Sequence, residues 1–296
     1  MRRFVAFALS TSLLVTPLLF SRDAAAFCRT TTESGTSQAC AQTGKPVFWR
    51  NACVGYKLNE SASAKVTLTE TTTVTGNAFA SWSALSCGTA GPSISAVNIG
   101  TTKSSTIGYD QASGATNENI IVYRDGDWPY ADQSQVALTT LTYRKDTGEL
   151  LDADMEVNAT LKLVPADPIP SNGFDLLTVF THEAGHFLGL AHTDVPKATM
   201  FASYDPGTVD QRTQKQDDVD GICAAYPSSG SRPTAAGSVA ADKCDPRKTP
   251  SIDTGSSSSG CSAGGSGTAG SGVWGLALLG IACAAAIRRA RKARAA

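Results

Sequence analysis

The chain has 296 residues, which is enough for one or two domains. Its formal net charge is −1, but residues 27–228 alone carry 13 Lys and Arg against 22 Asp and Glu, a net charge of −9. A domain that binds nucleic acid needs a basic surface. The acidic balance therefore argues against nucleic acid as a partner.

The first 26 residues have the pattern of a secretory signal peptide. Two arginines precede an apolar run at 4–20, and the small residues 24–26 offer a cleavage site. A membrane anchor is the alternative, but the apolar run is short and ends in small residues. We therefore expect a secreted protein whose mature chain begins at Phe27.

The use of cysteine fits an oxidising compartment. Six of the eight cysteines lie within residues 27–244 and can form three disulfides. These are Cys28, Cys40, Cys53, Cys87, Cys223 and Cys244. The sequence does not choose among the possible pairings. No two cysteines have CxxC spacing, so a cysteine-based zinc site or redox motif finds no support.

Hydrophobic patterns predict a series of strands and helices before residue 228. Strands are expected within 46–58 and at 94–99, 119–123, 136–144 and 150–157. Helices are expected at about 74–86, from 172 or 173 to 188, and at 216–225. The pattern of the Thr-rich run 67–75 is ambiguous and predicts neither a helix nor a strand. A turn signal at 146–148 predicts that the strands on either side of it form an antiparallel hairpin.

The composition changes after residue 228. Residues 229–272 are rich in Ser, Gly, Ala, Thr and Pro, which predicts a flexible linker because so little apolar area can be buried. Residues 273–296 combine a short apolar run with a basic end. The run is short for a stable membrane span, although a simple tail anchor remains the alternative.

Residues 182–192 read HEAGHFLGLAH and contain all three histidines of the chain. On a helix His182 and His186 share one face, so both imidazoles can reach one metal ion. Gly189 can adopt a positive φ and end the helix, which lets His192 supply a third ligand. Three protein ligands leave an open position, as in catalytic zinc sites. Glu183 is then the general base that takes a proton from the attacking water.

At these residues the chain resembles the metzincins, and within them the matrixins. The motif is followed by Ala198-Thr199-Met200, which is similar to the family's methionine turn, and by Tyr204. The resemblance implies that Met200 lies beneath the metal and that Tyr204 lines a hydrophobic substrate pocket. Residues 216–226 resemble the closing helix of the family, where the acidic pair Asp217 and Asp218 is structural.

The resemblance also implies a fold and an activity. The expected fold is a metzincin-type α+β domain over 27–228, with a twisted, mostly parallel sheet, an antiparallel edge strand and three main helices. The expected activity is that of a monomeric zinc endopeptidase that binds peptide or protein substrates along the edge strand. Two rival hypotheses stay open: a catalytically silent zinc-binding surface module, and a structural surface protein whose motif is accidental.

Three departures from the matrixin pattern bear on regulation and metal content. No cysteine-switch propeptide is found before Val47, so latency, if any, works differently. No histidine is left for a structural zinc, and Thr193 replaces the serine that is common after the third histidine.

Calcium could bind among oxygen ligands, and a solvated acidic surface is the alternative. The candidates are Asp125, Asp127, Asp152, Asp154 and Glu156.

The C-terminal tail resembles a different pattern. Gly260-Cys261-Ser262, a Gly/Ser spacer, the apolar run and the basic end are similar to the sorting signals of myxobacterial surface proteins. This resemblance implies a Gram-negative host, processing near Cys261, transient membrane contact, and attachment to the outer surface or release from it.

Overall fold

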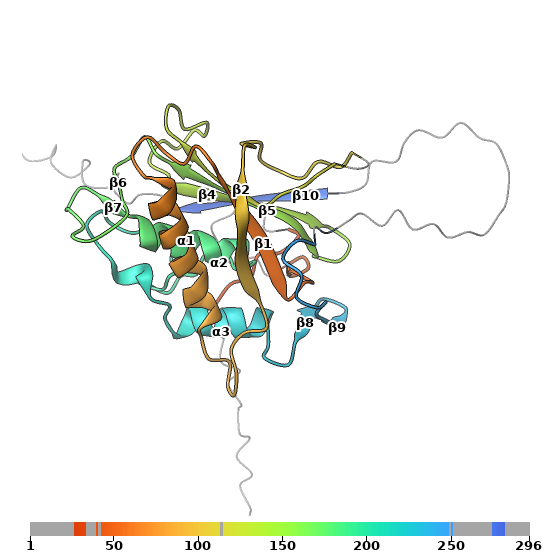
Figure 1. Cartoon of the computed structure of the whole chain (residues 1–296). Coiled ribbons are helices and arrows are strands. Elements are labelled where there is room, and N and C mark those ends of the chain that lie inside the picture. Colours follow the sequence, from red (N-terminus) through yellow and green to blue (C-terminus); the bar gives the residue numbers. More distant parts are fainter. Residues whose placement is uncertain are drawn as a thin grey trace, which may run out of the picture.

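The computed structural model describes residues 27–33, 40, 43–112, 115–248, 250 and 274–281. A six-stranded sheet with the order β10-β4-β5-β3-β1-β2 forms its centre (Figure 1). The strands are β1 (Cys53–Asn59), β2 (Ser95–Thr102), β3 (Ile120–Arg124), β4 (Ala137–Arg144), β5 (Leu150–Asn158) and β10 (Trp274–Ile281).

The sheet is mixed, with more parallel than antiparallel pairs, as the sequence predicted. The pairs β1–β2, β1–β3 and β3–β5 are parallel. In contrast, β4 is antiparallel to β5 and β10 is antiparallel to β4. The five strands predicted from the sequence are present within a few residues of their expected bounds, apart from the first, which begins only at Cys53.

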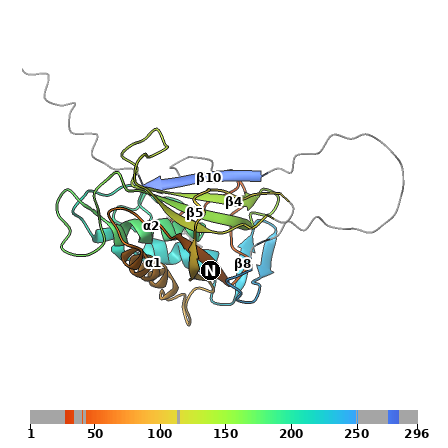
Figure 2. The same ribbon diagram turned by 45° about the horizontal axis from the view of Figure 1, so that its top comes forward.

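Among the described residues, three α-helices accompany the sheet: α1 (Leu68–Ser83), α2 (Leu176–Phe187) and α3 (Gln216–Ala225). Helices α1 and α2 lie on the same face of the sheet (Figures 1 and 2). Aromatic rings fill the space between helices and sheet, with centroids 4.7 Å apart for Tyr56 and Phe79 and 5.1 Å apart for Phe79 and Phe187. This core fixes the position of α2, the helix that carries the HExxH motif.

Helix α1 begins six residues before the predicted start at Val74. Thr67 caps its N-terminus, since its hydroxyl accepts from Glu70 N–H while Glu70 accepts from Thr67 N–H. Four threonines in the Thr-rich run then donate to the carbonyl four residues earlier. The ambiguous run is therefore the first half of the helix.

Helix α2 starts later than predicted, at Leu176 rather than at residue 172 or 173. Asp175 is its N-cap and not part of its first turn, because the carboxylate accepts from Thr178 N–H at 3.0 Å and from the Thr178 hydroxyl at 2.6 Å. The residues just before the helix form β7 (Phe174–Asp175), which pairs in parallel with β6 (Leu163–Val164).

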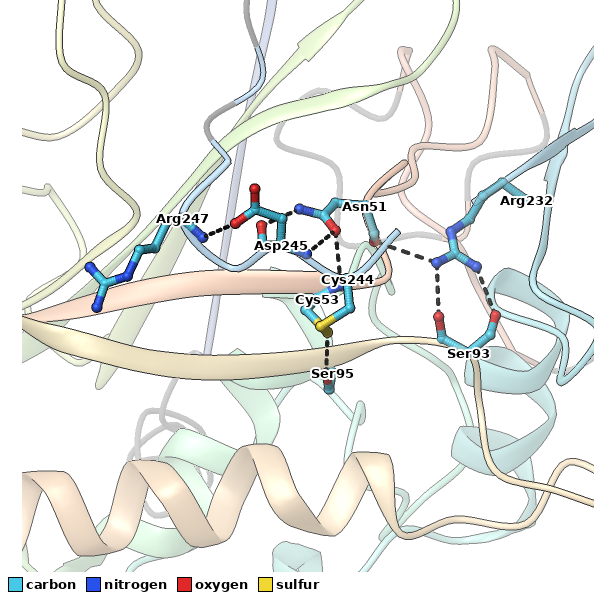
Figure 3. The surroundings of a disulfide bond; sticks show 8 residues. All are labelled: Asn51, Cys53, Ser93, Ser95, Arg232, Cys244, Asp245 and Arg247. Atoms are coloured by element: carbon cyan, nitrogen blue, oxygen red, sulfur yellow. Dashed lines mark hydrogen bonds between the residues drawn. A yellow bond between two sulfur atoms is a disulfide. The ribbon is translucent and has the colours of Figure 1, made fainter. Parts of the chain in front are cut away.

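The three disulfides expected from six cysteines are present as Cys28–Cys40, Cys53–Cys244 and Cys87–Cys223. The bond from Cys53 to Cys244 ties the segment that follows Ser228 to β1 (Figure 3). This segment contains a hairpin of β8 (Ser231–Thr234) and β9 (Gly237–Ala240). The prediction of a flexible linker from residue 229 is therefore wrong for residues 231–240.

Arg232 anchors this hairpin. Its side chain is fully buried and donates to the carbonyl oxygens of Trp49 at 2.7 Å and Ser93 at 2.8 Å. Its guanidinium also lies 4.9 Å from the centre of the Tyr226 ring. Figure 3 shows this guanidinium aimed at Ser93 beside the disulfide. The buried guanidinium of Arg232 therefore holds the hairpin against the rest of the domain.

The predicted terminal segments fall largely outside the described residues, which include neither 1–26 nor 282–296. Within the predicted apolar tail, residues 274–281 form β10 along the outer edge of β4. Among the residues that are described, none belongs to a helix long and apolar enough to cross a membrane.

Candidate metal centre

The HExxH segment lies on α2, and the chain turns sharply just beyond it. His182, Glu183 and His186 are fully buried in the helix. Gly189 has a φ of +90°, a conformation that residues with a side chain rarely adopt. The turn is closed by a hydrogen bond from Leu190 N–H to the Gly185 carbonyl at 2.9 Å. It brings His192, which is 4 % exposed, back towards the helix.

The three imidazoles converge on one point. The Nε2 atom of His192 lies 3.1 Å from the Nε2 atoms of both His182 and His186. All three ligand atoms are within 4.8 Å of one another. Among the residues that the structure describes, only this group brings together three side chains able to hold a metal ion.

The opposite ring nitrogens are engaged by the backbone. His182 Nδ1 lies 2.6 Å from the Thr199 carbonyl, and His186 Nδ1 lies 2.9 Å from the Leu190 carbonyl. A carbonyl accepts, so each Nδ1 donates and each Nε2 keeps a lone pair for a metal. Burial lowers the pKa of both rings, and it lowers the pKa of His192 to about 4. The donor set fits zinc, which takes neutral imidazoles in a tetrahedral site.

A segment near the N-terminus holds the loop that carries His192. Ala191 N–H donates to the Cys28 carbonyl at 2.9 Å, and Thr30 N–H donates to the Gly189 carbonyl at 3.0 Å. The Cys28–Cys40 disulfide secures this segment in turn. Because the loop is hydrogen-bonded on both sides of Leu190, the third imidazole has a defined position.

Three aromatic residues bind the backbone of the helix and its C-terminal end. The indole N–H groups of Trp82 and Trp49 donate to the carbonyls of Thr181 at 2.8 Å and Phe187 at 2.7 Å. The Tyr226 hydroxyl donates to the Leu188 carbonyl at 2.8 Å. Two of these acceptors are carbonyls at the helix end, which have no partner within the helix.

Met200 lies against α2 at Gly185, and Asp218 holds the backbone on either side of the Thr199–Met200 peptide bond. Met200 is buried, and its N–H donates to Asp218 Oδ1 at 3.0 Å. The other carboxylate oxygen accepts from Thr199 N–H at 2.8 Å and Lys215 N–H at 2.8 Å. Since the Thr199 carbonyl is the partner of His182, Asp218 indirectly orients a candidate ligand. The structural role expected for Asp218 agrees with these contacts.

Gly185 lies where Met200 presses against α2. A Cβ atom on Gly185 would be 2.2 Å from Met200 Sδ and 2.8 Å from Trp82 Cζ2. The sequence motif allows any residue at this position, and the packing does not. The close approach of Met200 therefore requires a glycine in the middle of the helix.

Gly185→Ala is expected to lower the free energy of unfolding by about 1–3 kcal/mol, because the buried Met200 has to move. Gly76→Ala is the matched control, since a Cβ there meets nothing within 4 Å in the middle of α1. This control should stabilise the protein by about 0.5–1 kcal/mol. Urea unfolding of both variants measures the difference, and equal stability of the two would contradict the packing argument.

Thr139 is a site residue that sequence reasoning missed. It is fully buried on β4, and its hydroxyl donates to Glu183 Oε2 at 2.5 Å. The contact joins a strand and a helix that are 44 residues apart in the chain. No local pattern marks such a residue, since a threonine in a strand is ordinary.

Tyr204 lies beside the segment that leads into α2. Its ring is 6 % exposed and packs edge-on against Phe174, with 5.8 Å between the ring centroids. This places an aromatic wall near the start of the helix. Whether it lines a substrate pocket stays a prediction.

The acidic residues proposed for calcium do not form a common site. Asp154 accepts from Gly108 N–H at 2.6 Å and from Ile120 N–H at 2.8 Å, and burial raises its pKa to about 6. Glu156 is paired with Arg124 at 2.6 Å. Asp125 instead accepts from the Ser63 hydroxyl at 2.6 Å. These carboxylates serve the fold, and calcium finds no support among the described residues.

A cleft of about 480 Å³ lies apart from the histidines. It is bordered by residues of β1, β5 and the segment around Asp242, and it includes none of the three histidines or Glu183. We place the chemistry at the histidines, because a cleft without converging reactive groups offers no mechanism.

The mixed sheet, the three helices and the histidine cluster are consistent with a metzincin-type domain. The model of the Matrixin family, Peptidase_M10, matches residues 48–227. The chain therefore belongs to the matrixin family, as the sequence resemblance implied.

Several curated proteins are similar over part of the chain. Human neutrophil collagenase is 38 % identical over 79 residues, which is 27 % of this chain and 17 % of that protein. Human matrix metalloproteinase-20 is 38 % identical over 87 residues, covering 29 % and 17 % respectively. Matrix metalloproteinase-27 of Tupaia belangeri is 39 % identical over 80 residues, covering 26 % and 15 %. The chain thus spans less than a fifth of the length of these relatives.

Proposed function

We propose that this matrixin is a zinc-dependent endopeptidase in which His182, His186 and His192 bind the metal and Glu183 is the general base. The observation that carries the proposal is the convergence of three Nε2 atoms within 4.8 Å beside a buried carboxylate. Family membership and the histidine cluster together suggest zinc as the cofactor. When bound, zinc would polarise the scissile carbonyl and lower the pKa of water towards about 7.

The chain's own residues supply the other parts of the mechanism. Glu183 takes a proton from the attacking water and returns it to the leaving amine. Thr139 donates to one oxygen of this carboxylate and holds its orientation. Met200 would form the apolar floor of the metal site, and Tyr204 would line the pocket for the substrate side chain. Hydrolysis then proceeds without a covalent intermediate on the protein.

Peptides or proteins in extended form are the proposed substrates. An extended chain can pair with the edge of β4, where backbone groups give affinity and side-chain pockets give specificity. The three disulfides support export to an oxidising compartment. We propose that the protein is secreted, with the first 26 residues as signal peptide and the tail as a surface sorting signal of a Gram-negative bacterium.

The purified protein is expected to hold one zinc ion per chain and to cleave an unfolded protein in a chelator-sensitive manner. Because zinc binds the folded state, its removal should also lower the midpoint of thermal unfolding. Metal analysis, a cleavage assay and a melting curve of the same sample provide the measurement. Stoichiometric zinc without any cleavage would instead favour the silent zinc-binding module.

A further inference from the structure

The outer edge of β4 lies directly beside the proposed catalytic residues. One side of β4 pairs with β5, and Thr139 on this strand donates to Glu183. Helix α2 packs against the same strand. A strand edge with unpaired N–H and C=O groups is a template for another extended chain. This edge is therefore where a strand-like ligand meets the site.

In the full chain this edge is taken by the protein's own C-terminal segment. β10 pairs antiparallel with β4 over its whole length, from Trp274 opposite Arg144 to Ile281 opposite Ala137. Leu279 is the residue opposite Thr139, so the strand passes the catalytic carboxylate. Figure 2 shows β10 lying along β4, and α2 contacts it as well.

The sequence of this segment suits strand pairing. Residues 274–281 read WGLALLGI and contain no charge and no proline. Between Pro250 and Trp274 lie 23 residues, of which 15 are Gly or Ser. A chain of that length can span up to about 75–80 Å, so the connection does not prevent docking. Attachment in one chain also raises the local concentration of the segment at the edge.

We propose that residues 274–281 are the resident ligand of the β4 edge and that they compete there with peptide substrates. The competition rests on the proposed function, whereas the docking itself does not. A substrate strand needs the same backbone N–H and C=O groups of β4 that β10 occupies. The histidines and Glu183 are at most 4 % exposed in the structure in which β10 occupies this edge. Withdrawal of the segment opens the site.

The test uses the full chain with Leu278→Pro and Leu279→Pro combined. Amides of neighbouring strand residues point to opposite edges, so one of these two prolines removes a donor that faces β4. Ser266→Pro is the matched control, because it adds a proline outside residues 274–281. Thermal unfolding of each variant reports on the fold, which should stay intact because the described core is formed by β1, β3, β4, β5 and the helices.

Two readouts separate docking from activity. In a Glu183→Gln background, which prevents self-cleavage, hydrogen exchange of the β4 amides that face β10 should become at least about tenfold faster in the double-proline variant, whereas the β4 amides that face β5 stay bonded. Equal exchange in the variant and the control would overturn the docking. With Glu183 intact, the double-proline variant should cleave an unfolded protein about five- to tenfold faster than the control. An unchanged rate in an active enzyme would overturn the competition.

Failure of this inference is distinguishable from failure of the proposed function. If no form of the protein cleaves any substrate, the proposed endopeptidase is wrong, and faster exchange in the double-proline variant still supports the docking. If all forms cleave at one rate and exchange alike, the endopeptidase stands and the ligand role of residues 274–281 is wrong.

Discussion

Glu183→Gln is expected to lower kcat for cleavage of an unfolded protein by about 10²–10⁴-fold, because an amide cannot accept the proton of the attacking water. The exchange keeps the shape of the side chain and the acceptor for the Thr139 hydroxyl. The zinc content should stay at one ion per chain, because glutamate is not among the three converging ligands. Steady-state kinetics and metal analysis on the same preparation measure both quantities.

Glu60→Gln serves as the matched control. This residue is exposed at the end of β1 and should change neither kcat nor zinc content. Loss of zinc in the Glu183 variant would contradict the assignment of metal binding to the three histidines alone. Equal inertness of wild type and variant, with zinc bound in both, would establish the silent zinc-binding module.

The candidate site was predictable where its geometry is local. His182 and His186 face one side of α2 because their spacing matches the helical period, and Gly189 turns the chain at a positive φ. Helix α3 at 216–225 likewise has its predicted bounds. In these cases neighbours in the sequence fix the structure, and distant contacts only add to it.

The features that the sequence did not predict depend on distant partners. Thr139 reaches Glu183 across 44 residues, and Arg232 reaches the Trp49 carbonyl across 183 residues. The pattern around residues 229–240 indicated a linker because it contains no large apolar residue other than Val239. The hairpin is held instead by a buried cation and a disulfide from Cys244 to Cys53. Composition indicates how much apolar area a segment can bury. It does not indicate a buried ion or a disulfide to a distant residue.

The pairing of β10 with β4 was also not predicted, because it too depends on a partner that is distant in the sequence. An apolar run followed by basic residues indicates a membrane-directed tail, and the same run is compatible with a strand. Local pattern cannot choose between them, since the choice depends on whether an unpaired strand edge lies within reach. The edge of β4 provides one. The segment predicted to be a sorting tail thus contains the strand that pairs with β4.

Asp218→Ala is expected to lower the free energy of unfolding by about 3–5 kcal/mol, since the buried N–H groups of Thr199 and Met200 both lose their acceptor. The carboxylate is 1 % exposed and accepts at 2.8 Å from Thr199 and at 3.0 Å from Met200. Asp218→Asn keeps one oxygen and should cost about half as much. Urea unfolding of the metal-free proteins measures the series.

The same substitution should weaken zinc binding by about 10–100-fold, because outer-shell partners orient the ligands. Asp218 holds the backbone of Thr199, whose carbonyl lies 2.6 Å from His182 Nδ1, so freeing this loop frees the ring. Asp220→Ala is the control on the same helix, where the side chain is exposed and accepts a hydrogen bond from Gln216. Competition with a chelator measures affinity. Unchanged zinc affinity in a destabilised Asp218→Ala protein would show that Asp218 supports only the fold. His182 would then keep its orientation without Asp218.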